Sequence, residues 1–297
     1  MINPEAYIDH LRYERRRPAN TVEAYGADLR QFAEYMERAL GVTRLEEAST
    51  GDIRTWILTL LEDRGLSARS VNRKLSALRD FCRFEQRAGR LTHNPTEGVR
   101  GPKFRGRLPE YVEAGDMERL LDPAMFADDF EGRRDRLMLE LFYATGMRLS
   151  ELLNLRREDI DLHGDRLKVL GKRDKERIIP FGGRMHDLLT SYMEYYAETL
   201  TPDTGNFYIF VAANGRRLYP KAVYRIVRKY LDMVTTIGKR SPHVIRHTFA
   251  THLLNRGADL NAIKEILGHS SLASTQVYTH NSMEQLKSIY KQAHPRA

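Results

Sequence analysis

Residues 267–280 read LGHSSLASTQVYTH, and this stretch decides how the rest of the chain is interpreted. Within it, His269 is followed nine positions later by Tyr278. Two further stretches stand upstream, since residues 243–247 read HVIRH and residues 145–148 read TGMR. Histidines, arginines and a tyrosine therefore recur at intervals through the second half of the chain.

These residue types suit the binding and attack of a phosphodiester. Arg148 and Arg246 carry planar guanidinium groups that bind phosphate oxygens bidentately and keep their charge. The hydroxyl of Tyr278 is able to form a covalent intermediate, but with an ordinary pKa of ~10 it needs help to lose its proton. His243 lies three residues before Arg246, so the two share a face if this segment is helical.

Taken alone, each of these residues has a simpler structural interpretation. Arg148 stands three residues before Glu151 and fits a surface ion pair. Tyr278 is one of 15 tyrosines, most of which are expected to be core aromatics. His243 and His247 have the spacing of a helical metal pair, but valine stands where a metalloprotease has its glutamate. We therefore expect no metal site.

The composition predicts a globular protein with a polyanionic partner. The 297 residues are 41% hydrophobic and 30% charged, and the formal net charge of +8 favours nucleic acid. Cys82 is the only cysteine, which rules out an internal disulfide and fits a reducing compartment. No apolar run approaches the ~20 residues of a membrane span, and the N-terminus lacks a signal-peptide pattern. We expect a cytoplasmic protein without membrane insertion.

Residues 1–98 read as a helical domain. Apolar residues recur at intervals of three and four, which is typical of amphipathic helices. The predicted helix starts are Asn3-Pro4, Asn20 or Thr21, Ser49 or Thr50, and Ser67.

The fourth of these helices is strongly basic, and too few acidic residues accompany the bases to pair with them. A solvated helix face is the simpler interpretation, but we favour a face that lies against DNA phosphates. The predicted DNA-binding residues are Arg69, Arg73, Lys74, Arg79 and Arg83.

Glycines, prolines and bases interleave over residues 99–110, which indicates a basic linker. The second domain, residues 111–297, mixes helices with short strands, so the fold class is mainly α with a small antiparallel β-sheet. Its predicted helices lie near 114–121, 132–145, 148–155, 184–199, 219–236, 243–255, 259–267 and 282–292, and its strands at 159–162, 166–170 and 177–181.

The joint pattern is more specific than any single residue. Arg148, Lys172, His243-x-x-Arg246, His269 and Tyr278 stand in the order and spacing of the motifs of the tyrosine recombinases, or integrase family. The chain resembles that family over nearly its whole length and is most similar to its Xer branch. The resemblance implies a two-domain architecture, with a helical core-binding (SAM-like) bundle followed by an α+β catalytic domain.

The resemblance also implies a role for each motif residue. Tyr278 would attack a DNA phosphate to give a 3′-phosphotyrosyl bond and a free 5′-hydroxyl. Arg148 and Arg246 would hold the nonbridging oxygens and stabilise the charge that grows there. His269 would donate a hydrogen bond to the same phosphate. His243 would accept the tyrosine proton.

The general acid that protonates the leaving 5′-oxygen is assigned by the same resemblance to Lys172. Arg173 follows it where the family often has glycine, so Lys175 is a second candidate, although alignment on Gly171 favours Lys172. No metal ion, nucleotide or other cofactor is implied, because the phosphotyrosyl bond keeps the energy of the broken diester.

The implied partners are a duplex recombination site of the dif type and a second recombinase, in a homo- or hetero-tetramer. The C-terminal tail, residues 282–297, would pack into a neighbouring protomer, and a septal DNA translocase is a further expected partner. The implied role is chromosome dimer resolution.

Three alternative functions stay open: an integrase of a mobile element, a type IB topoisomerase, and a DNA-binding protein without chemistry. The tail argues against the topoisomerase, and the intact motif set argues against a protein without chemistry.

Overall fold

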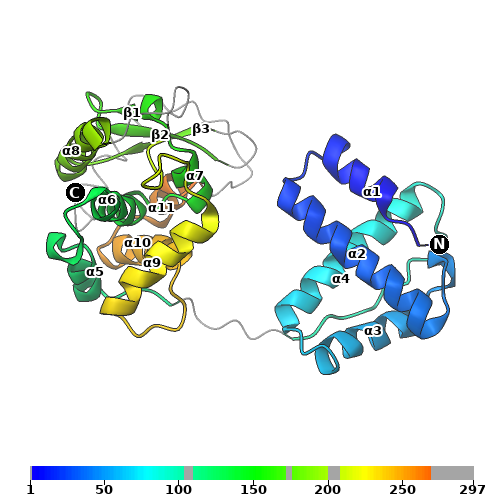
Figure 1. Cartoon of the computed structure of the whole chain (residues 1–297). Helices are drawn as coiled ribbons and strands as arrows, with labels where there is room; N and C mark the ends of the chain where they lie inside the picture. The colour runs from blue at the N-terminus through cyan, green and yellow to red at the C-terminus, as the bar shows by residue number, and fades with distance from the viewer. Residues whose placement is uncertain (1, 104–109, 172–175, 200–207, 269–297) are drawn as a thin grey trace. The chain divides into compact units, whose positions relative to one another are not determined.

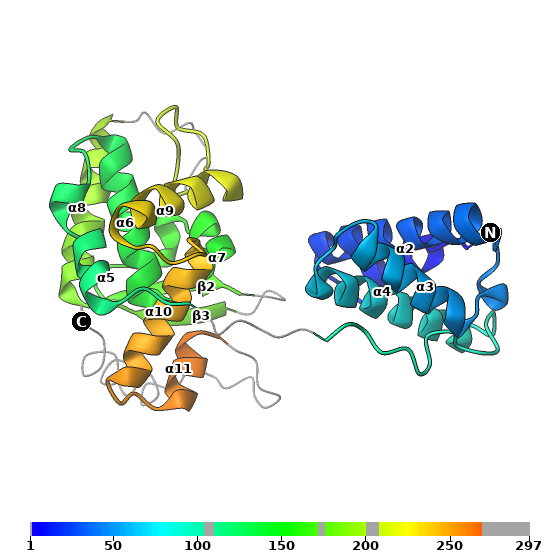
Figure 2. The same cartoon turned by 90° about the horizontal axis from the view of Figure 1, so that it is seen from below.

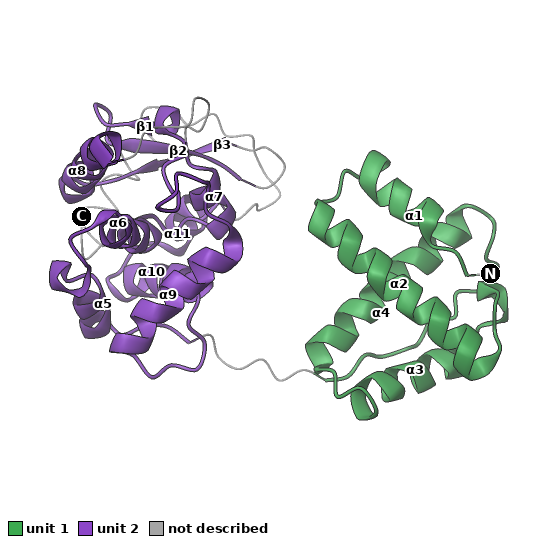
Figure 3. Cartoon of the chain, viewed as in Figure 1, with its two compact units in different colours: residues 1–107 green, residues 108–297 purple. Residues whose placement is uncertain are grey.

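A computed structural model describes residues 2–103, 110–171, 176–199 and 208–268. The chain divides into two compact units, residues 1–107 and 108–297, which are coloured separately in Figure 3. The expected class, mainly helical with a small antiparallel sheet in the second unit, is confirmed (Figure 1). Within the described part of the chain, no helix has both the length and the apolarity to cross a membrane.

Unit 1 is built from helices around one apolar core, in which the rings of Trp56 and Phe32 meet edge to face. The elements are α1 (Glu5–Asp9), a π-helical turn (His10–Glu14), α2 (Ala19–Leu40), a 3-10 turn (Leu45–Glu47), α3 (Thr50–Glu62) and α4 (Ala68–Arg87).

The predicted starts of the third and fourth helices are confirmed. The Ser49 hydroxyl accepts the backbone N–H of Asp52, and the Asp52 carboxylate accepts the backbone N–H of Ser49 in return. Ser67 accepts the N–H of Ser70 in the same way. These side chains satisfy donors that the first helical turn leaves unpaired.

The predicted start of the second helix, with Asn20 or Thr21 as its cap residue, is wrong by two or three residues. Helix α2 begins at Ala19, and Pro18 takes the capping position without a side-chain bond. The Pro18 carbonyl accepts the N–H groups of Thr21 (2.8 Å) and Val22 (3.1 Å). The fixed φ of proline lets it start a helix without a polar side chain.

Unit 2 combines helices with a three-stranded sheet, which is antiparallel throughout and whose strands lie in chain order. Its helices are α5 (Ala114–Leu120), α6 (Phe130–Thr145), α7 (Leu149–Asn154), α8 (Gly183–Thr199), α9 (Pro220–Val234), α10 (Pro242–Asn255) and α11 (Leu260–Ile266), with 3-10 turns at Pro123–Met125 and Arg157–Asp159. The strands are β1 (Ile160–Asp161), β2 (Arg166–Leu170) and β3 (Glu176–Pro180).

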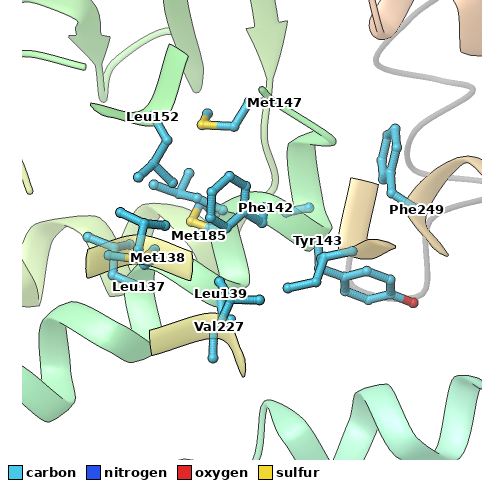
Figure 4. Close-up of a cluster of buried hydrophobic side chains, with 14 of the residues drawn as sticks. Leu137, Met138, Leu139, Phe142, Tyr143, Met147, Leu152, Met185, Val227 and Phe249 are labelled. Atoms are coloured by element: carbon cyan, nitrogen blue, oxygen red, sulfur yellow. The ribbon is translucent and has the colours of Figure 1, made fainter. Parts of the chain in front are cut away.

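Helix α6 runs through the middle of unit 2 and is buried along most of its length. Its side chains Leu137, Met138 and Phe142 lie in one apolar cluster with Met185 of α8 and Val227 of α9 (Figure 4). Helix α6 also packs against α10, and Arg246 of α10 donates to the carbonyl of Gly146, so the C-terminal end of α6 lies beside the first turns of that helix. Figure 2 shows α10 and α11 side by side, with β3 nearby.

Candidate active site

Three of the six predicted catalytic residues, Arg148, His243 and Arg246, belong to the described part of unit 2. The predicted residues Lys172, His269 and Tyr278, the alternative Lys175 and the tail 282–297 lie outside the described residues.

Arg148 occupies the capping position of α7, as its sequence context predicted. It follows the turn at Gly146, whose φ of +57° lies in the left-handed region; a Cβ there would stand 2.5 Å from the Phe249 ring. Both constraints favour glycine. Arg148 donates from Nη1 to Oε1 of Glu151 (2.7 Å), and its backbone N–H donates to Oε2 (2.7 Å). Its side chain is still 29% exposed.

Arg246 is buried in the first turns of α10, which starts at Pro242, one residue before the expected range, with Ser241 as its cap residue. Its guanidinium donates to the carbonyl of Gly146 and, from Nη2, to that of Leu267 (2.7 Å). Arg246 therefore joins the end of α6 to the end of α11.

A third arginine, Arg177 of β3, completes the cluster. Its Nη2 donates to Oε2 of Glu151 (2.6 Å), and its Nη1 donates to the carbonyl of Ile266. The Glu151 carboxylate thus lies between two guanidinium groups, one from α7 and one from the sheet. We call Arg148, Glu151, Arg177 and Arg246 the arginine cluster.

The three arginines meet at the C-terminal end of α11. Arg148 donates from Nη2 to the carbonyl of Gly268 (2.9 Å), so the carbonyls of residues 266, 267 and 268 each accept from a different arginine. Helix C-termini carry unpaired carbonyls and a partial negative charge, which cations satisfy. This fixes the backbone immediately before His269.

The arginine cluster contains three guanidinium groups and one carboxylate, which pairs with two of them, so positive charge is in excess. Burial, together with the charges of Arg148 and Arg177, lowers the pKa of Arg246 to about 10. Burial would raise the pKa of Glu151, but Arg177 and Arg148 hold it below its usual range. An anion bound here would relieve the repulsion among the arginines.

His243 lies one turn before Arg246, near the start of α10, and is exposed. The two residues are therefore brought to the same end of one helix, as the spacing predicted. The interpretation of Glu151 as a structural partner of Arg148 is also confirmed by their ion pair.

Sequence reasoning gave no role to Arg177. It lies two residues before Ile179 on β3, and both side chains are buried. The strand period of two was a usable signal, because it places residues 177 and 179 on the same inward face.

In unit 1, the structure narrows the predicted DNA-binding face. Lys74 is buried and donates to Asp28 (2.7 Å) and Gln31 (2.6 Å) of α2. Arg73, also predicted, pairs with the other oxygen of Asp28 and remains half-exposed. Lys74 therefore joins two helices and does not lie on the exposed face, because its position falls within the apolar stripe of α4.

Arg79 is likewise engaged within unit 1, where it donates to the carbonyl of Val99. Asn72 donates to the carbonyl of Pro102 (2.9 Å), so residues 99–102 of the predicted linker pack along α4. Arg69 and Arg83 are exposed on α4.

Comparisons with known proteins cover both units. The phage integrase family matches residues 110–285, and the N-terminal SAM-like domain of phage integrases matches residues 5–89. The tyrosine recombinase XerC of Azotobacter vinelandii is 40% identical, over 99% of this chain and 96% of the relative. The tyrosine recombinase XerD of Listeria monocytogenes serotype 4b is 37% identical, over 99% of this chain and 98% of the relative.

Solved structures share the fold. XerH recombinase in a post-cleavage complex with palindromic difH substrate gives a TM-score of 0.72 at 22% identity, over 92% of this chain and 80% of that one. The Tn1549 transposon integrase in complex with transposon right end DNA gives a TM-score of 0.73 at 20% identity, over 97% of this chain and 99% of that one. The sequence matches and the shared fold agree along the chain, which therefore belongs to the phage integrase family, the tyrosine recombinases.

Proposed function

We propose that this protein is a site-specific recombinase that cuts and rejoins duplex DNA through a 3′-phosphotyrosyl intermediate. The observation that carries the proposal is the arginine cluster, in which three guanidinium groups, those of Arg177 and Arg246 buried, stand beside one carboxylate, and burial together with the charges of Arg148 and Arg177 lowers the pKa of Arg246. A phosphodiester supplies the missing negative charge. Family membership identifies the phosphodiester as DNA and the nucleophile as a tyrosine.

Arg148 and Arg246 bind the nonbridging oxygens of the scissile phosphate. Both are fixed before substrate arrives, because Glu151 and the carbonyls of Gly146, Leu267 and Gly268 hold their guanidinium groups. Donors fixed in this way stabilise charge that develops in the transition state without reorganising.

Tyr278 is the proposed nucleophile, and its oxygen forms the bond to phosphorus as the bond to the 5′-oxygen breaks. His243 takes the tyrosine proton, and Lys172 gives a proton to the departing 5′-oxygen. His269 donates a hydrogen bond to the phosphate. Rejoining reverses these steps with a 5′-hydroxyl from another strand, so no metal ion or nucleotide takes part.

The relatives named XerC and XerD support a housekeeping role, and we propose chromosome dimer resolution in the cytoplasm. The working form is a homo- or hetero-tetramer on two dif-like sites, closed by exchange of the tail 282–297 and controlled by a septal DNA translocase. Likeness to the transposon integrase is a likeness of fold alone, although a mobile-element integrase would use the same chemistry.

The proposal is tested by trapping the covalent intermediate. A binding site is first selected from random duplex DNA and then rebuilt with a nick beside the cleavage point, so that the cleaved fragment diffuses away. The wild-type protein should form a covalent adduct, and Tyr278→Phe should bind the same duplex yet form none. Tyr224→Phe, at an exposed tyrosine of α9, is the matched control and should react as the wild type does.

An adduct in Tyr278→Phe would move the nucleophile to another residue. Absence of any adduct in the wild type on DNA that it binds would overturn the proposed chemistry. Recombination between two selected sites, with the genomic position of the natural site, then separates the chromosomal role from the mobile-element role.

A further inference from the structure

Arg177 is the side chain that ties the sheet to the rest of the arginine cluster. It is 5% exposed, and its two bonds reach different segments, the Glu151 carboxylate of α7 and the Ile266 carbonyl at the end of α11. Its own strand, β3, begins at Glu176, four residues after Lys172 in the sequence. One guanidinium therefore joins two segments of the proposed site, the start of α7 and the end of α11.

The bond to Glu151 has an electrostatic consequence for Arg148. Each oxygen of this carboxylate accepts from one arginine, Oε1 from Arg148 and Oε2 from Arg177, and Oε2 also accepts the backbone N–H of Arg148. Arg177 thus takes up part of the negative charge of Glu151. Without it, the full carboxylate would act on Arg148 alone and oppose the attraction of Arg148 for phosphate.

The bond to Ile266 has a geometric consequence. Arg148 and Arg246 donate to the next two carbonyls, those of Gly268 and Leu267, so all three bonds fix one short segment. A Cβ added at Gly268 would lie 3.0 Å from Cδ of Arg177, which shows how closely this backbone approaches the side chain.

We propose that Arg177 is a positioning residue, which fixes Glu151 and the end of α11 so that Arg148 keeps both its orientation and its net charge toward the phosphate. The proposal rests on the phosphoryl-transfer chemistry proposed above. Arg177 itself does not touch the DNA.

Arg134 of α6 is the matched control for a role limited to stability. It is equally buried, pairs with Asp135 (2.7 Å) and donates to the carbonyl of Val211 (3.2 Å). None of these partners belongs to the arginine cluster. Arg134→Met should therefore cost folding stability in the same way as Arg177→Met but leave the chemistry of the folded enzyme unchanged.

The experiment uses the full chain and measures single-turnover adduct formation on the nicked duplex at saturating protein. Circular dichroism defines a temperature at which every variant is folded, and the rates are compared there. The variants are Arg177→Met, Arg177→Lys, Glu151→Gln, the double variant of Arg177→Met with Glu151→Gln, and Arg134→Met.

Arg177→Met should cleave about 100-fold more slowly than the wild type, since small displacements of positioned groups cost this much. Its affinity for DNA should change by less than about threefold, because many other phosphate contacts remain. Arg177→Lys keeps the charge beside Glu151 but not both bonds, so its rate should fall between those of Arg177→Met and the wild type.

The double variant is the decisive measurement. If Arg177 acts through the charge of Glu151, adding Glu151→Gln should speed Arg177→Met by about fivefold or more, as expected for strongly coupled neighbours. A residue needed only for folding would give a double variant slower than either single variant.

The positioning role is wrong if Arg177→Met cleaves within threefold of the wild type, if Arg134→Met loses as much rate, or if Glu151→Gln restores nothing. Should Arg177→Met not fold at any usable temperature, Arg177→Lys takes its place, and a wild-type rate in Arg177→Lys that Glu151→Gln does not change would equally overturn the proposal. A wild type without adduct would refute the proposed chemistry instead, and the two failures are thereby distinguished.

Discussion

The two units contain the same small arrangement of charges, used differently. In unit 1, buried Asp28 holds half-exposed Arg73 and buried Lys74. In unit 2, buried Glu151 holds partly exposed Arg148 and buried Arg177. In both places one buried carboxylate pairs with two basic side chains and joins two elements.

The difference is the third base. Arg246 adds a further buried guanidinium to the arginine cluster, and its pKa is lowered to about 10 by burial and by its two neighbours. The Asp28 network also lies between α2 and α4, whereas the arginine cluster surrounds the end of α11, immediately before His269. The comparison indicates that the additional buried base beyond the ion-paired set, and not the ion pair itself, distinguishes the proposed reaction site from a structural bridge.

The largest effect is expected from removing Arg246, the third arginine of the arginine cluster. Arg246→Ala should slow adduct formation by about 10²–10³-fold, or about 3–4 kcal/mol in the barrier, as for loss of a preorganised donor. The matched change in unit 1, Arg73→Ala, should leave the single-turnover rate at saturating protein within about threefold, because it removes at most a phosphate contact. Similar losses from both changes would show that the two clusters are not functionally different.

The next largest effect is expected on the stability of unit 1, when the buried ion pair between Asp28 and Lys74 is broken. Asp28→Ala leaves Lys74 buried without its carboxylate, which should lower the free energy of unfolding of unit 1 by about 3 kcal/mol. Trp56 is the single tryptophan and lies in the core of unit 1, so its fluorescence during urea denaturation reports this unit alone. A midpoint equal to that of the wild type would mean that the buried ion pair contributes nothing.

A smaller effect is expected for the exposed bases of α4. Arg83→Glu should weaken binding to the selected site and reduce the salt dependence of affinity by about one unit in the slope of log K against log salt. Arg38→Glu makes the same charge change on exposed α2 and should leave the slope unaltered. If the wild type, Arg83→Glu and Arg38→Glu all showed the same slope, Arg83 would be a solvent-exposed residue that does not contact DNA.

The smallest effect is a pH dependence at Glu151. Its pKa in the folded protein is held below the ordinary value by Arg177 and Arg148 against the effect of burial, so its ionisation stabilises unit 2 above the pKa of the unfolded chain. That stabilisation should be complete above about pH 5.5 and decline as the pH falls through the folded pKa. The stability difference between wild type and Glu151→Gln, measured by hydrogen exchange of unit 2 peptides, should therefore shrink below about pH 4.5. A difference that stays constant to pH 3 would contradict the assignment.

The sequence alone determined the helices and the identity of the motif residues. Apolar residues at intervals of three and four predicted α2, α3 and α4, and polar caps located the starts of α3 and α4, because these features depend only on neighbouring residues. The spacing of His243 and Arg246 likewise placed both at one end of α10. Arg148 was correctly expected at a helix start beside Glu151.

Tertiary structure decided which basic side chains are buried in ion pairs within the protein. Lys74 fits the spacing of its apolar neighbours Val71 and Leu78, and Arg177 fits that of Ile179, so each position was marked as inward-facing while its charge suggested the opposite. A charged side chain is buried only where an oppositely charged partner compensates it. The partners here, Asp28 and Glu151, come from distant segments of the chain. The arginine cluster therefore arises from packing between α7, β3, α10 and α11, which no local pattern contains.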